Sequence, residues 1–402
     1  MQAMKYIIIL GDGMSDYPID SLDNMTPLMA AKTPNIDRLA SMGRCGMFST
    51  VPPDMPPGSE IANLAVLGYN VKEVFQGRGV LEAASMGVKL DDNDLAMRCN
   101  LICIENEKIK NHSAGHISTE EASLLIDFLN KEMASDEIRF YPGVSYRHLL
   151  VIRNGNNNIT CTPPHDVTGT LFRDVLIKPI NGTSTADLLN GLIYRSQEIL
   201  QNHQVNIDRI RCGKDPANSI WPWSPGHRPK MKTLKELYGI EGAVISAVDL
   251  LYGIGVYAGM KIIKVEGATG LYNTNYEGKA KAAVNALKET DLVYLHIEAS
   301  DEAGHEGNAE LKTRTIEYLD SRVVRYIMEE TAKMKEHVAI ALLPDHPTPC
   351  ALKTHTHDPV PFIIYHPGSK PDDVSEYNEE ACKSGSFGNI EGNQFMKLLL
   401  QY

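Results

Sequence analysis

Carboxylate and imidazole side chains follow three apolar segments of this chain, at the points where strands should end. Asp12 follows YIIILG, Asp301 follows LVYLHIEAS, and Asp345 follows AIALLP. Open α/β sheets bind their ligands outside the carboxyl ends of the strands, so residues far apart in sequence can meet there. The candidate set is Asp12, Ser59, Asp301, His305, Asp345, His346, His355 and His357. This set predicts a metal centre with a serine hydroxyl beside it.

Spacing divides these residues between two metal ions. Asp301 and His305 are four positions apart and would share one face of a helical turn. Asp345 and His346 are adjacent, so their side chains diverge at a strand end, which suits a two-metal site better than a single chelated ion. The expected sets are Asp12, Ser59, Asp345 and His346 for one ion, and Asp301, His305 and either His355 or His357 for the other.

The ligand types and the serine together indicate phosphoryl transfer. Mixed oxygen and nitrogen ligands favour Mn²⁺ or Zn²⁺, with Mg²⁺ and Co²⁺ as alternatives. Two neighbouring ions can hold the attacking and leaving oxygens of a phosphoryl group in line, and one of them can lower the pKa of a hydroxyl nucleophile. We therefore expect Ser59 to become phosphorylated.

Each of these residues also has a purely structural explanation. Asp12 lies in a Gly-Asp-Gly turn, Ser59 stands where a helix N-cap would stand, and His305 could be a surface histidine. The pair Asp345 and His346 could open a turn. Their joint placement at successive strand ends favours the metal centre over four separate explanations.

The elements that must position these residues begin with a βα unit. A strand is expected over residues 6–10, followed by a helix over residues 35–42 that Thr33 would cap. The four prolines within residues 51–58 exclude regular structure, so Ser59 should stand at a loop-to-helix junction, facing a positive helix end.

Apolar strands and helices alternate again after residues 221–229, a loop rich in proline, glycine and tryptophan. Strands are expected over residues 261–265, 292–297 and 338–343, and helices over residues 279–289 and 311–334. Between residues 69 and 206 the segments are shorter and alternate in hydropathy. The expected fold is therefore an α/β core of residues 1–68 and 207–402 with a mostly parallel sheet, interrupted by an inserted smaller α+β domain of residues 69–206.

Composition narrows the class of protein. A net charge of −12 argues against nucleic acid as a partner, because binding to a phosphate backbone relies on clustered Lys and Arg. The seven cysteines are scattered and odd in number, which indicates reduced thiols and a cytoplasmic location. No apolar run approaches the roughly 18 residues of a membrane span, so no membrane partner is expected. The sequence allows a homo-oligomer without predicting one.

Six motifs carry a resemblance to a known family. They are GDGM at Gly11, KTPNIDRLA at Lys32, PPGSEIANLAVLGY at Pro56, EASDEAGHEG at Glu298, PDHPTP at Pro344 and HTHDPVPF at His355. The chain resembles the archaeal-type cofactor-independent (2,3-bisphosphoglycerate-independent) phosphoglycerate mutases of the alkaline phosphatase superfamily. The resemblance covers nearly the whole chain and implies an alkaline-phosphatase-like three-layer core.

The resemblance also implies roles for individual residues. It makes Ser59 the phosphorylated nucleophile that moves the phosphoryl group of 3-phosphoglycerate to the 2-hydroxyl. An H-x-x-D/N-P-V-P pattern in related sequences falls on His355, which is therefore the expected last ligand, with His357 held in reserve. The implied metal ligands are Asp12, Ser59, Asp345 and His346 at one ion, and Asp301, His305 and His355 at the other.

Substrate recognition is expected from cations and from the inserted domain. Arg98, Arg147, Arg228 and Lys279 are candidates to bind the carboxylate and phosphate of a small phosphorylated substrate, although a surface charge is the more common explanation for any one of them. His112, in the segment NHSAGH, resembles a histidine that contacts the transferred phosphate in related mutases. Closure of the inserted domain as a lid would keep water from the phosphoserine.

The leading hypothesis is a phosphoglycerate mutase of glycolysis and gluconeogenesis. The runner-up is a homoserine kinase-like phosphotransferase of the same family, and the absence of a G-x-x-x-x-G-K-[ST] loop favours the mutase only slightly. A metal-dependent phosphomonoesterase is a third alternative, which the large insertion disfavours. A non-catalytic metal-binding protein should lack the serine or one of the paired ligands, and none is missing.

Overall fold

The chain divides into two compact units. In the computed structural model, which describes residues 4–182 and 184–401, unit 1 comprises Met1–Phe75 with Met231–Tyr402, and unit 2 comprises Gln76–Lys230. Both ends of the insertion lie later in the chain than expected, at residues 76 and 230 rather than 69 and 206. Within the described ranges, no helix is both long and apolar enough to cross a lipid bilayer.

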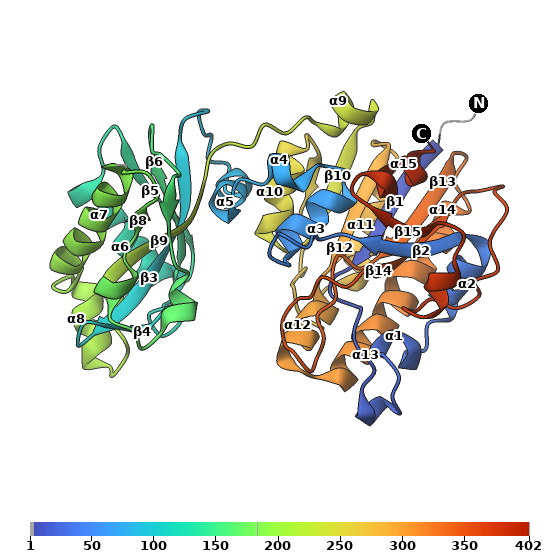
Figure 1. Ribbon diagram of the computed structural model, residues 1–402, viewed down its shortest axis with the longest axis horizontal. Helices are drawn as coiled ribbons and strands as arrows, with labels where there is room; N and C mark the ends of the chain where they lie inside the picture. Colours follow the sequence, from blue (N-terminus) through green and yellow to red (C-terminus); the bar gives the residue numbers. More distant parts are fainter. Residues whose placement is uncertain (1–3, 183, 402) are drawn as a thin grey trace. The chain divides into compact units, whose positions relative to one another are not determined.

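Unit 1 is built on an eight-stranded sheet with the order β11-β10-β12-β1-β13-β14-β2-β15 (Figure 1). Its strands are β1 (Met4–Gly11), β2 (Arg44–Ser49), β10 (Gly242–Ile245), β11 (Lys261–Ile263), β12 (Leu292–Ile297), β13 (His337–Leu343), β14 (Val360–Tyr365) and β15 (Gly388–Glu391). All neighbours are parallel except the pairs β13–β14 and β14–β2. The expected mostly parallel α/β sheet is therefore confirmed.

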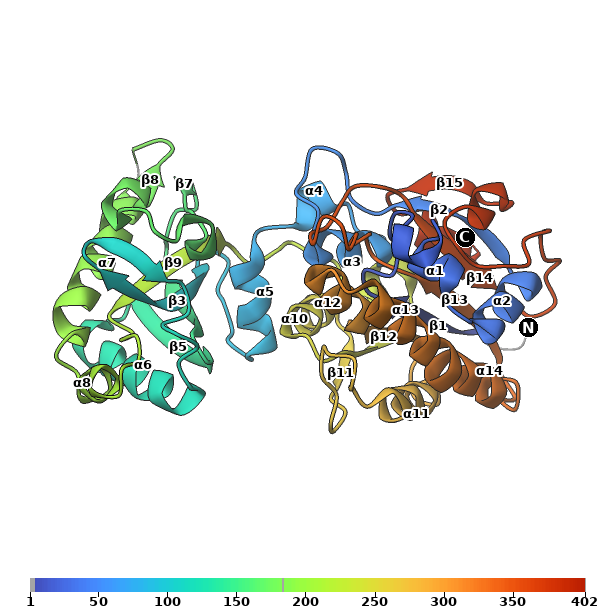
Figure 2. The same ribbon diagram turned by 90° about the horizontal axis from the view of Figure 1, so that it is seen from below.

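Helices cover both faces of this sheet (Figures 1 and 2). The α-helices of unit 1 are α1 (Pro27–Ala30), α2 (Pro34–Met42), α3 (Ser59–Val66), α4 (Val71–Val74), α9 (Leu234–Tyr238), α10 (Asp249–Tyr257), α11 (Tyr276–Ala286), α12 (Ala299–Glu306), α13 (Ala309–Tyr318), α14 (Arg325–Thr331) and α15 (Gln394–Leu400). Ile7 and Ile9 of β1 pack in one buried cluster with α2, α11 and the α13–α14 run. Side chains alternate across a strand, and Tyr294 of β12 faces α3 on the other side, where its hydroxyl bonds to Asn63.

Two local expectations in unit 1 are wrong in instructive ways. The helix expected over residues 311–334 is interrupted by a π-helical segment, Leu319–Val324, between α13 and α14. Helix α2 begins at Pro34 as expected, but the Thr33 side chain makes no capping bond. The carboxylate of Asp320, in the π-helical segment, instead accepts bonds from the backbone N–H groups of Asn35 and Ile36, at 2.8 and 2.7 Å.

Unit 2 has its own sheet and its own core. Strand β3 pairs with β4, β6 and β9, and β6 pairs with β5. The strands of this sheet are β3 (Leu95–Glu105), β4 (Lys108–Asn111), β5 (Ile138–Val144), β6 (Arg147–Ile152) and β9 (Ser219–Gly226), and β7 (Ile159–Thr160) and β8 (Lys178–Pro179) form a separate pair. The helices are α5 (Arg78–Ser85), α6 (Thr119–Met133), α7 (Ser184–Leu200) and α8 (Gln204–Arg211). Apolar side chains of α6 and α7 pack against this sheet in a separate buried cluster.

Strand β9 explains why the insertion extends beyond residue 206. The segment expected to be a loop, residues 221–229, contains most of β9, whose residues pair antiparallel with β3 of unit 2. Trp221 and Trp223 are buried in the core of unit 2, and the Trp223 indole N–H donates to Asn100 Oδ1 at 3.0 Å. The prolines in the segment suggested a loop, but the buried tryptophans make it a strand of this sheet.

Candidate metal centre

The carboxyl ends of three adjacent strands carry the candidate ligands of unit 1. Strand β1 lies between β12 and β13, with Gly11 in register with Ile297 and Leu10 in register with Leu343. The next residue, Asp12, continues this pairing through its backbone N–H, which donates to Ile297 O at 2.9 Å. Residues that follow these strands therefore emerge side by side at one edge of the sheet.

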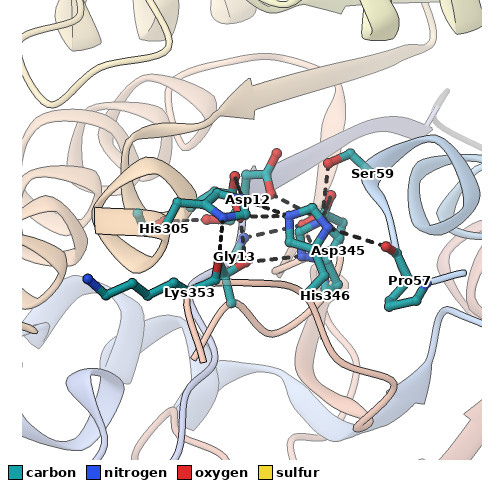
Figure 3. A network of polar contacts seen from close by, with 12 residues as sticks. Asp12, Gly13, Pro57, Ser59, His305, Asp345, His346 and Lys353 are labelled. Atoms are coloured by element: carbon teal, nitrogen blue, oxygen red, sulfur yellow. Dashed lines mark hydrogen bonds and ion pairs between the residues drawn. The ribbon is translucent and has the colours of Figure 1, made fainter. Parts of the chain in front are cut away.

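Asp12, Asp345 and His346 form the first group of candidate ligands. Each offers a ligand atom within 4.8 Å of the other two, and all three residues are buried. Ser59 is the first residue of α3, and its Oγ lies 3.1 Å from His346 Nε2 (Figure 3). The expected loop-to-helix position of Ser59 is thus confirmed, and the four residues of the first expected set lie together.

Asp301, His346 and His355 form a second group with the same spacing of ligand atoms, in which His355 is only partly buried. Asp301 and His305 lie on α12, with His305 Nε2 3.2 Å from the Asp301 carboxylate and 2.9 Å from His355 Nε2. The ring of His346 stacks on that of His355 with 3.8 Å between centroids. The two groups therefore adjoin at His346, a sharing that the two separate expected sets did not include.

The structure distinguishes the two alternatives for the last ligand, His355 and His357, by their positions. His355 Nε2 lies 3.4 Å from the Asp301 carboxylate, within the second group. His357 is exposed, and its Nε2 lies 2.8 Å from the carbonyl oxygen of Met55. The geometry thus brings His355 to the centre and leaves His357 outside it.

The hydrogen bonds of His346 indicate which ring nitrogen is free. The Thr348 hydroxyl donates to Asp301 Oδ1, so it can only accept from His346 Nδ1, 3.3 Å away. His346 Nδ1 therefore carries the proton, and Nε2 is the basic nitrogen. This Nε2 faces both the Ser59 hydroxyl and the carboxylate of Asp345, whose Oδ2 is 3.4 Å away.

Burial and the proximity of several carboxylates make a bound cation electrostatically favourable at this centre. Burial raises the pKa of Asp12 well above its ordinary value, and the carboxylates of Asp345 and Asp301 raise it further. Burial acts in the same direction on the pKa of Asp301, but hydrogen bonds from His305 and His355 outweigh it and hold that pKa well below its ordinary value. The hydrogen bond between Asp301 and His305 also raises the pKa of His305 to about 9.

These residues fit divalent metal ions. Asp12 Oδ1 is buried without a hydrogen-bond partner among the described residues, as expected for an oxygen that ligates a cation. At Gly13, whose φ is +63°, a Cβ atom would lie 2.7 Å from Asp301 Oδ1, so only glycine leaves that carboxylate its space. Carboxylate oxygens and imidazole nitrogens are ligands that Mn²⁺ and Zn²⁺ accept.

Three buried side chains outside the candidate set support the candidate ligands through hydrogen bonds. His296 lies in β12 with Nε2 2.8 Å from Asp12 Oδ2, and the Asn63 amide donates to Asp345 Oδ2 at 2.8 Å. Tyr294 in turn donates its hydroxyl hydrogen bond to Asn63. The available signal was the pair of polar residues in the otherwise apolar stretch LVYLHI, on one face of a strand.

Three of the five candidate substrate residues gather within unit 2. The guanidinium of Arg98 lies 4.4 Å from the centroid of the Trp223 ring, and that of Arg147 lies 5.4 Å from the centroid of the Tyr146 ring. The His112 ring contacts the same Tyr146 edge-on, with 5.8 Å between centroids, and burial lowers the pKa of His112. Arg147 is exposed, whereas Arg98 also pairs with Glu82 at 3.0 Å.

Arg228 and Lys279 lie elsewhere. Arg228 is exposed in unit 2, 3.9 Å from the carboxylate of Asp92. Lys279 of α11 is fully buried in unit 1, and its Nζ donates to the carbonyl oxygen of His296 at 3.2 Å. Burial lowers the pKa of Lys279 to about 8. Lys279 therefore supports the strand behind the metal centre, in contrast to the expected role as a substrate-facing cation.

The fold and the site together are typical of metal-dependent α/β phosphotransferases. A family model described as 2,3-bisphosphoglycerate-independent phosphoglycerate mutase matches residues 40–206. The mutase of that description from Methanosarcina acetivorans is 51% identical over 99% of this chain and 100% of its own length. A probable mutase from Geobacter sulfurreducens is 48% identical over the same shares. The chain belongs to the family of 2,3-bisphosphoglycerate-independent phosphoglycerate mutases.

Solved structures agree with this assignment. A protein from Pyrococcus horikoshii is 31% identical and superimposes with a TM-score of 0.86, covering 100% of this chain and 97% of that chain. The cofactor-independent phosphoglycerate mutase from Thermoplasma acidophilum is 29% identical, with a TM-score of 0.71 and coverage of 100% and 99%. The resemblance inferred from the six motifs is thus confirmed.

Proposed function

We propose that this chain is an isomerase that interconverts 3-phosphoglycerate and 2-phosphoglycerate through a phosphoserine at Ser59. Relatives that match almost the entire chain at about half identity carry the name of this activity. The observation that supports the mechanism is the position of Ser59 Oγ, 3.1 Å from the basic Nε2 of His346, where the two ligand groups adjoin (Figure 3).

In this reaction the phosphoryl group passes from the 3-oxygen of the substrate to Ser59, and then from Ser59 to the 2-oxygen. Ser59 Oγ attacks phosphorus, the bond between phosphorus and the 3-oxygen of the substrate breaks, and the serine proton passes to the departing alkoxide. The 2-hydroxyl of the retained glycerate then attacks the phosphorus of the phosphoserine, the bond between phosphorus and Ser59 Oγ breaks, and the proton of the 2-hydroxyl passes to Ser59 Oγ. Divalent ions held by the two groups would lower the pKa of the serine hydroxyl and offset charge on the phosphoryl oxygens.

Several residues of this chain prepare Ser59 for the attack. Ser59 begins α3, so its hydroxyl lies at the positive end of that helix dipole. The Asn63 amide, one helical turn after Ser59, donates both to the Ser59 carbonyl oxygen and to Asp345 Oδ2, each at 2.8 Å, so it links the nucleophile to a proposed metal ligand. The ligands we assign are Asp12, Ser59, Asp345 and His346 for one ion and Asp301, His305 and His355 for the other, with Mn²⁺ or Zn²⁺ as the preferred metals.

Unit 2 supplies the groups that bind the small phosphorylated carboxylate in this proposal. The partial clustering of His112, Arg98 and Arg147 around Tyr146 and Trp223 supports that role, because guanidinium groups match carboxylate and phosphate oxygens in a bidentate way. His112 keeps a basic nitrogen at neutral pH because burial lowers its pKa. Phosphoglycerates are intracellular metabolites, so we place the enzyme in the cytoplasm.

The test is product formation by the metal-loaded protein. Incubation with 3-phosphoglycerate, followed by phosphorus NMR, should yield 2-phosphoglycerate, and Ser59→Ala should abolish it. Removing the nucleophile eliminates the covalent route, so the rate should fall by at least about 10⁴-fold while the other ligands remain. Unchanged turnover in Ser59→Ala would contradict the phosphoserine mechanism.

A parallel sample separates the mutase from its alternatives. The same protein with ATP and homoserine should form no phosphohomoserine, and release of inorganic phosphate from 3-phosphoglycerate should stay far below isomerisation. Phosphohomoserine without isomerisation would instead identify the kinase-like alternative, and phosphate release without isomerisation would identify a phosphomonoesterase.

A further inference from the structure

A fully buried lysine contacts the two loops that carry proposed metal ligands, and no proposed chemical step uses it. Lys312 of α13 has 0% exposure, and its ammonium donates to three oxygens. These are the carbonyl oxygen of Ser15 at 3.0 Å, Asp16 Oδ2 at 2.8 Å and the carbonyl oxygen of Thr348 at 2.8 Å. An ammonium group has three N–H donors, so this arrangement uses its full capacity.

The three acceptors belong to the two loops that carry metal ligands. Ser15 and Asp16 lie in the loop after β1 that contains Asp12, and Thr348 lies in the loop after β13 that contains Asp345. Lys312 itself lies on α13, which directly follows α12, the helix that carries Asp301 and His305. Figure 2 shows these two helices next to each other. One side chain therefore links the three segments that hold both ligand groups.

Thr348 extends this link to the ligands themselves. Its backbone N–H donates to the Ser15 carbonyl oxygen at 3.2 Å, which joins the two loops directly. Its hydroxyl donates to Asp301 Oδ1 and accepts from His346 Nδ1. A shift of the Thr348 backbone would therefore move a hydrogen-bond partner of one ligand in each group.

Asp16 anchors the lysine charge in the same loops. Its carboxylate accepts from the backbone N–H groups of Tyr17, at 2.8 Å, and Cys350, at 3.0 Å. The Asp16 backbone N–H donates to the carboxylate of Glu379 at 3.1 Å. Backbone N–H groups hold the carboxylate, and both charged groups are buried, so the orientation of the pair is more restricted than that of a surface ion pair.

We propose that the buried Lys312–Asp16 pair is the positioning unit of the metal centre. It holds the two loops that follow β1 and β13 in place relative to helices α12 and α13. The proposal rests on the proposed metal ligands. A buried ion pair is seldom needed for stability alone, because its desolvation offsets its attraction and apolar residues of similar volume serve as well. The bonds to two loop carbonyls, in contrast, have no apolar substitute, and partners behind ligands typically change metal affinity by about 10- to 100-fold.

The experiment measures Mn²⁺ affinity by isothermal titration calorimetry on the metal-stripped full chain. Lys312→Met should raise the Kd for Mn²⁺ at least about tenfold. The double variant Lys312→Met/Asp16→Asn removes the unpaired buried carboxylate, so it should melt at a higher temperature than Lys312→Met while keeping the weakened Kd. A purely structural pair would give the opposite result, with affinity restored together with stability.

Activity provides a second readout of positioning. In Lys312→Met the Mn²⁺ concentration for half-maximal isomerisation should rise in step with the Kd, while kcat at saturating Mn²⁺ stays within about threefold of the wild type, since the reacting groups are unchanged. The matched control is Lys383→Met, which removes an exposed lysine paired with Glu380 and should leave the Kd unchanged.

The outcomes distinguish this inference from the proposed function. A folded double variant with the wild-type Kd, or a control that weakens binding as much as Lys312→Met, overturns the positioning role while leaving the mutase assignment intact. Wild-type protein that binds Mn²⁺ without isomerising 3-phosphoglycerate overturns the function, and the calorimetric comparison of variants still decides the role of Lys312. Wild-type protein that binds no Mn²⁺ overturns the inference.

Discussion

Histidines in this protein take opposite electrostatic roles according to their surroundings. His305 is half-buried beside Asp301, and the hydrogen bond to that carboxylate raises its pKa. His148 of β6 is buried without a carboxylate partner, and burial lowers its pKa from the ordinary 6.5 to about 3. Its Nδ1 accepts the backbone N–H of Gly143 at 3.0 Å, and its Nε2 is buried with no partner among the described residues. His148 is therefore a neutral core residue of unit 2.

This neutral histidine predicts acid sensitivity of unit 2. In the unfolded chain His148 is protonated below about pH 6.5, whereas in the folded protein it stays neutral down to about pH 3. The unfolded state therefore binds more protons between these pH values, and the free energy of unfolding decreases as the pH falls through this range. Between pH 7 and pH 5 the loss should be about 2 kcal/mol. Urea unfolding followed by tryptophan fluorescence measures it, because Trp221 and Trp223 both lie in unit 2.

The control for this prediction is His148→Gln, which retains an acceptor for Gly143 but does not titrate. It should lose about 2 kcal/mol less than the wild type over the same pH range. An equal loss in both proteins would show that other groups cause the acid sensitivity.

At the scale of elements, the first turn of α2 is capped by a residue of the π-helical segment between α13 and α14. The π-helical segment Leu319–Val324 adds a residue to the turn, and Asp320 within it is buried against the first turn of α2. Its carboxylate satisfies the N–H groups of Asn35 and Ile36, as well as the Asn35 side-chain amide. A residue from a distant helix thus performs the capping that the neighbouring Thr33 was expected to provide.

Replacing this distant cap should destabilise unit 1 more than replacing the local residue. Asp320→Ala leaves the buried N–H groups of Asn35 and Ile36 without an acceptor and should cost about 2 kcal/mol. Thr33→Val keeps the volume of a buried side chain that makes no capping bond, so it should cost less than Asp320→Ala, about 1 kcal/mol or less. Thermal unfolding followed by circular dichroism compares the two, and similar losses would contradict the assignment of the cap.

At the scale of the whole molecule, the candidate metal ligands and the candidate substrate residues lie mostly in different units. The candidate ligands, from Asp12 to His355, lie in unit 1, while His112, Arg98 and Arg147 lie in unit 2. Each unit has its own sheet and its own buried apolar cluster. Ligands that bind the folded state of one unit should therefore stabilise that unit first.

Metal removal tests this division. Mn²⁺ at about 100 times its Kd should add about 2.7 kcal/mol to the stability of unit 1, and a chelator should remove that gain. Calorimetry should show the rise in the transition of unit 1, whereas the tryptophan fluorescence transition, which reports unit 2, should hardly move. A fluorescence midpoint that shifts as far as the calorimetric one would contradict metal binding by unit 1 alone.

Local signals sufficed for much of the fold and for the proposed ligands. Apolar runs ending in Asp12, Asp301 and Asp345 predicted parallel strands with polar carboxyl ends, because hydropathy and strand ends are encoded in consecutive residues. The spacing of Asp301 and His305 predicted a shared helical face, which α12 provides. The prolines before Ser59 predicted the loop-to-helix junction that the structure contains.

Only the tertiary structure decided what depends on residues distant in sequence. Strand β9 was mistaken for a loop because its partner β3 lies more than a hundred residues earlier and two of its own residues are prolines. The support of Asp12 by His296 comes from 284 residues away, and that of Ser15 by Lys312 from 297 residues away. No sequence window contains both members of such pairs, so the apolar pattern could place the ligands at strand ends, while the packing of the sheet, helices and loops decided what holds them there.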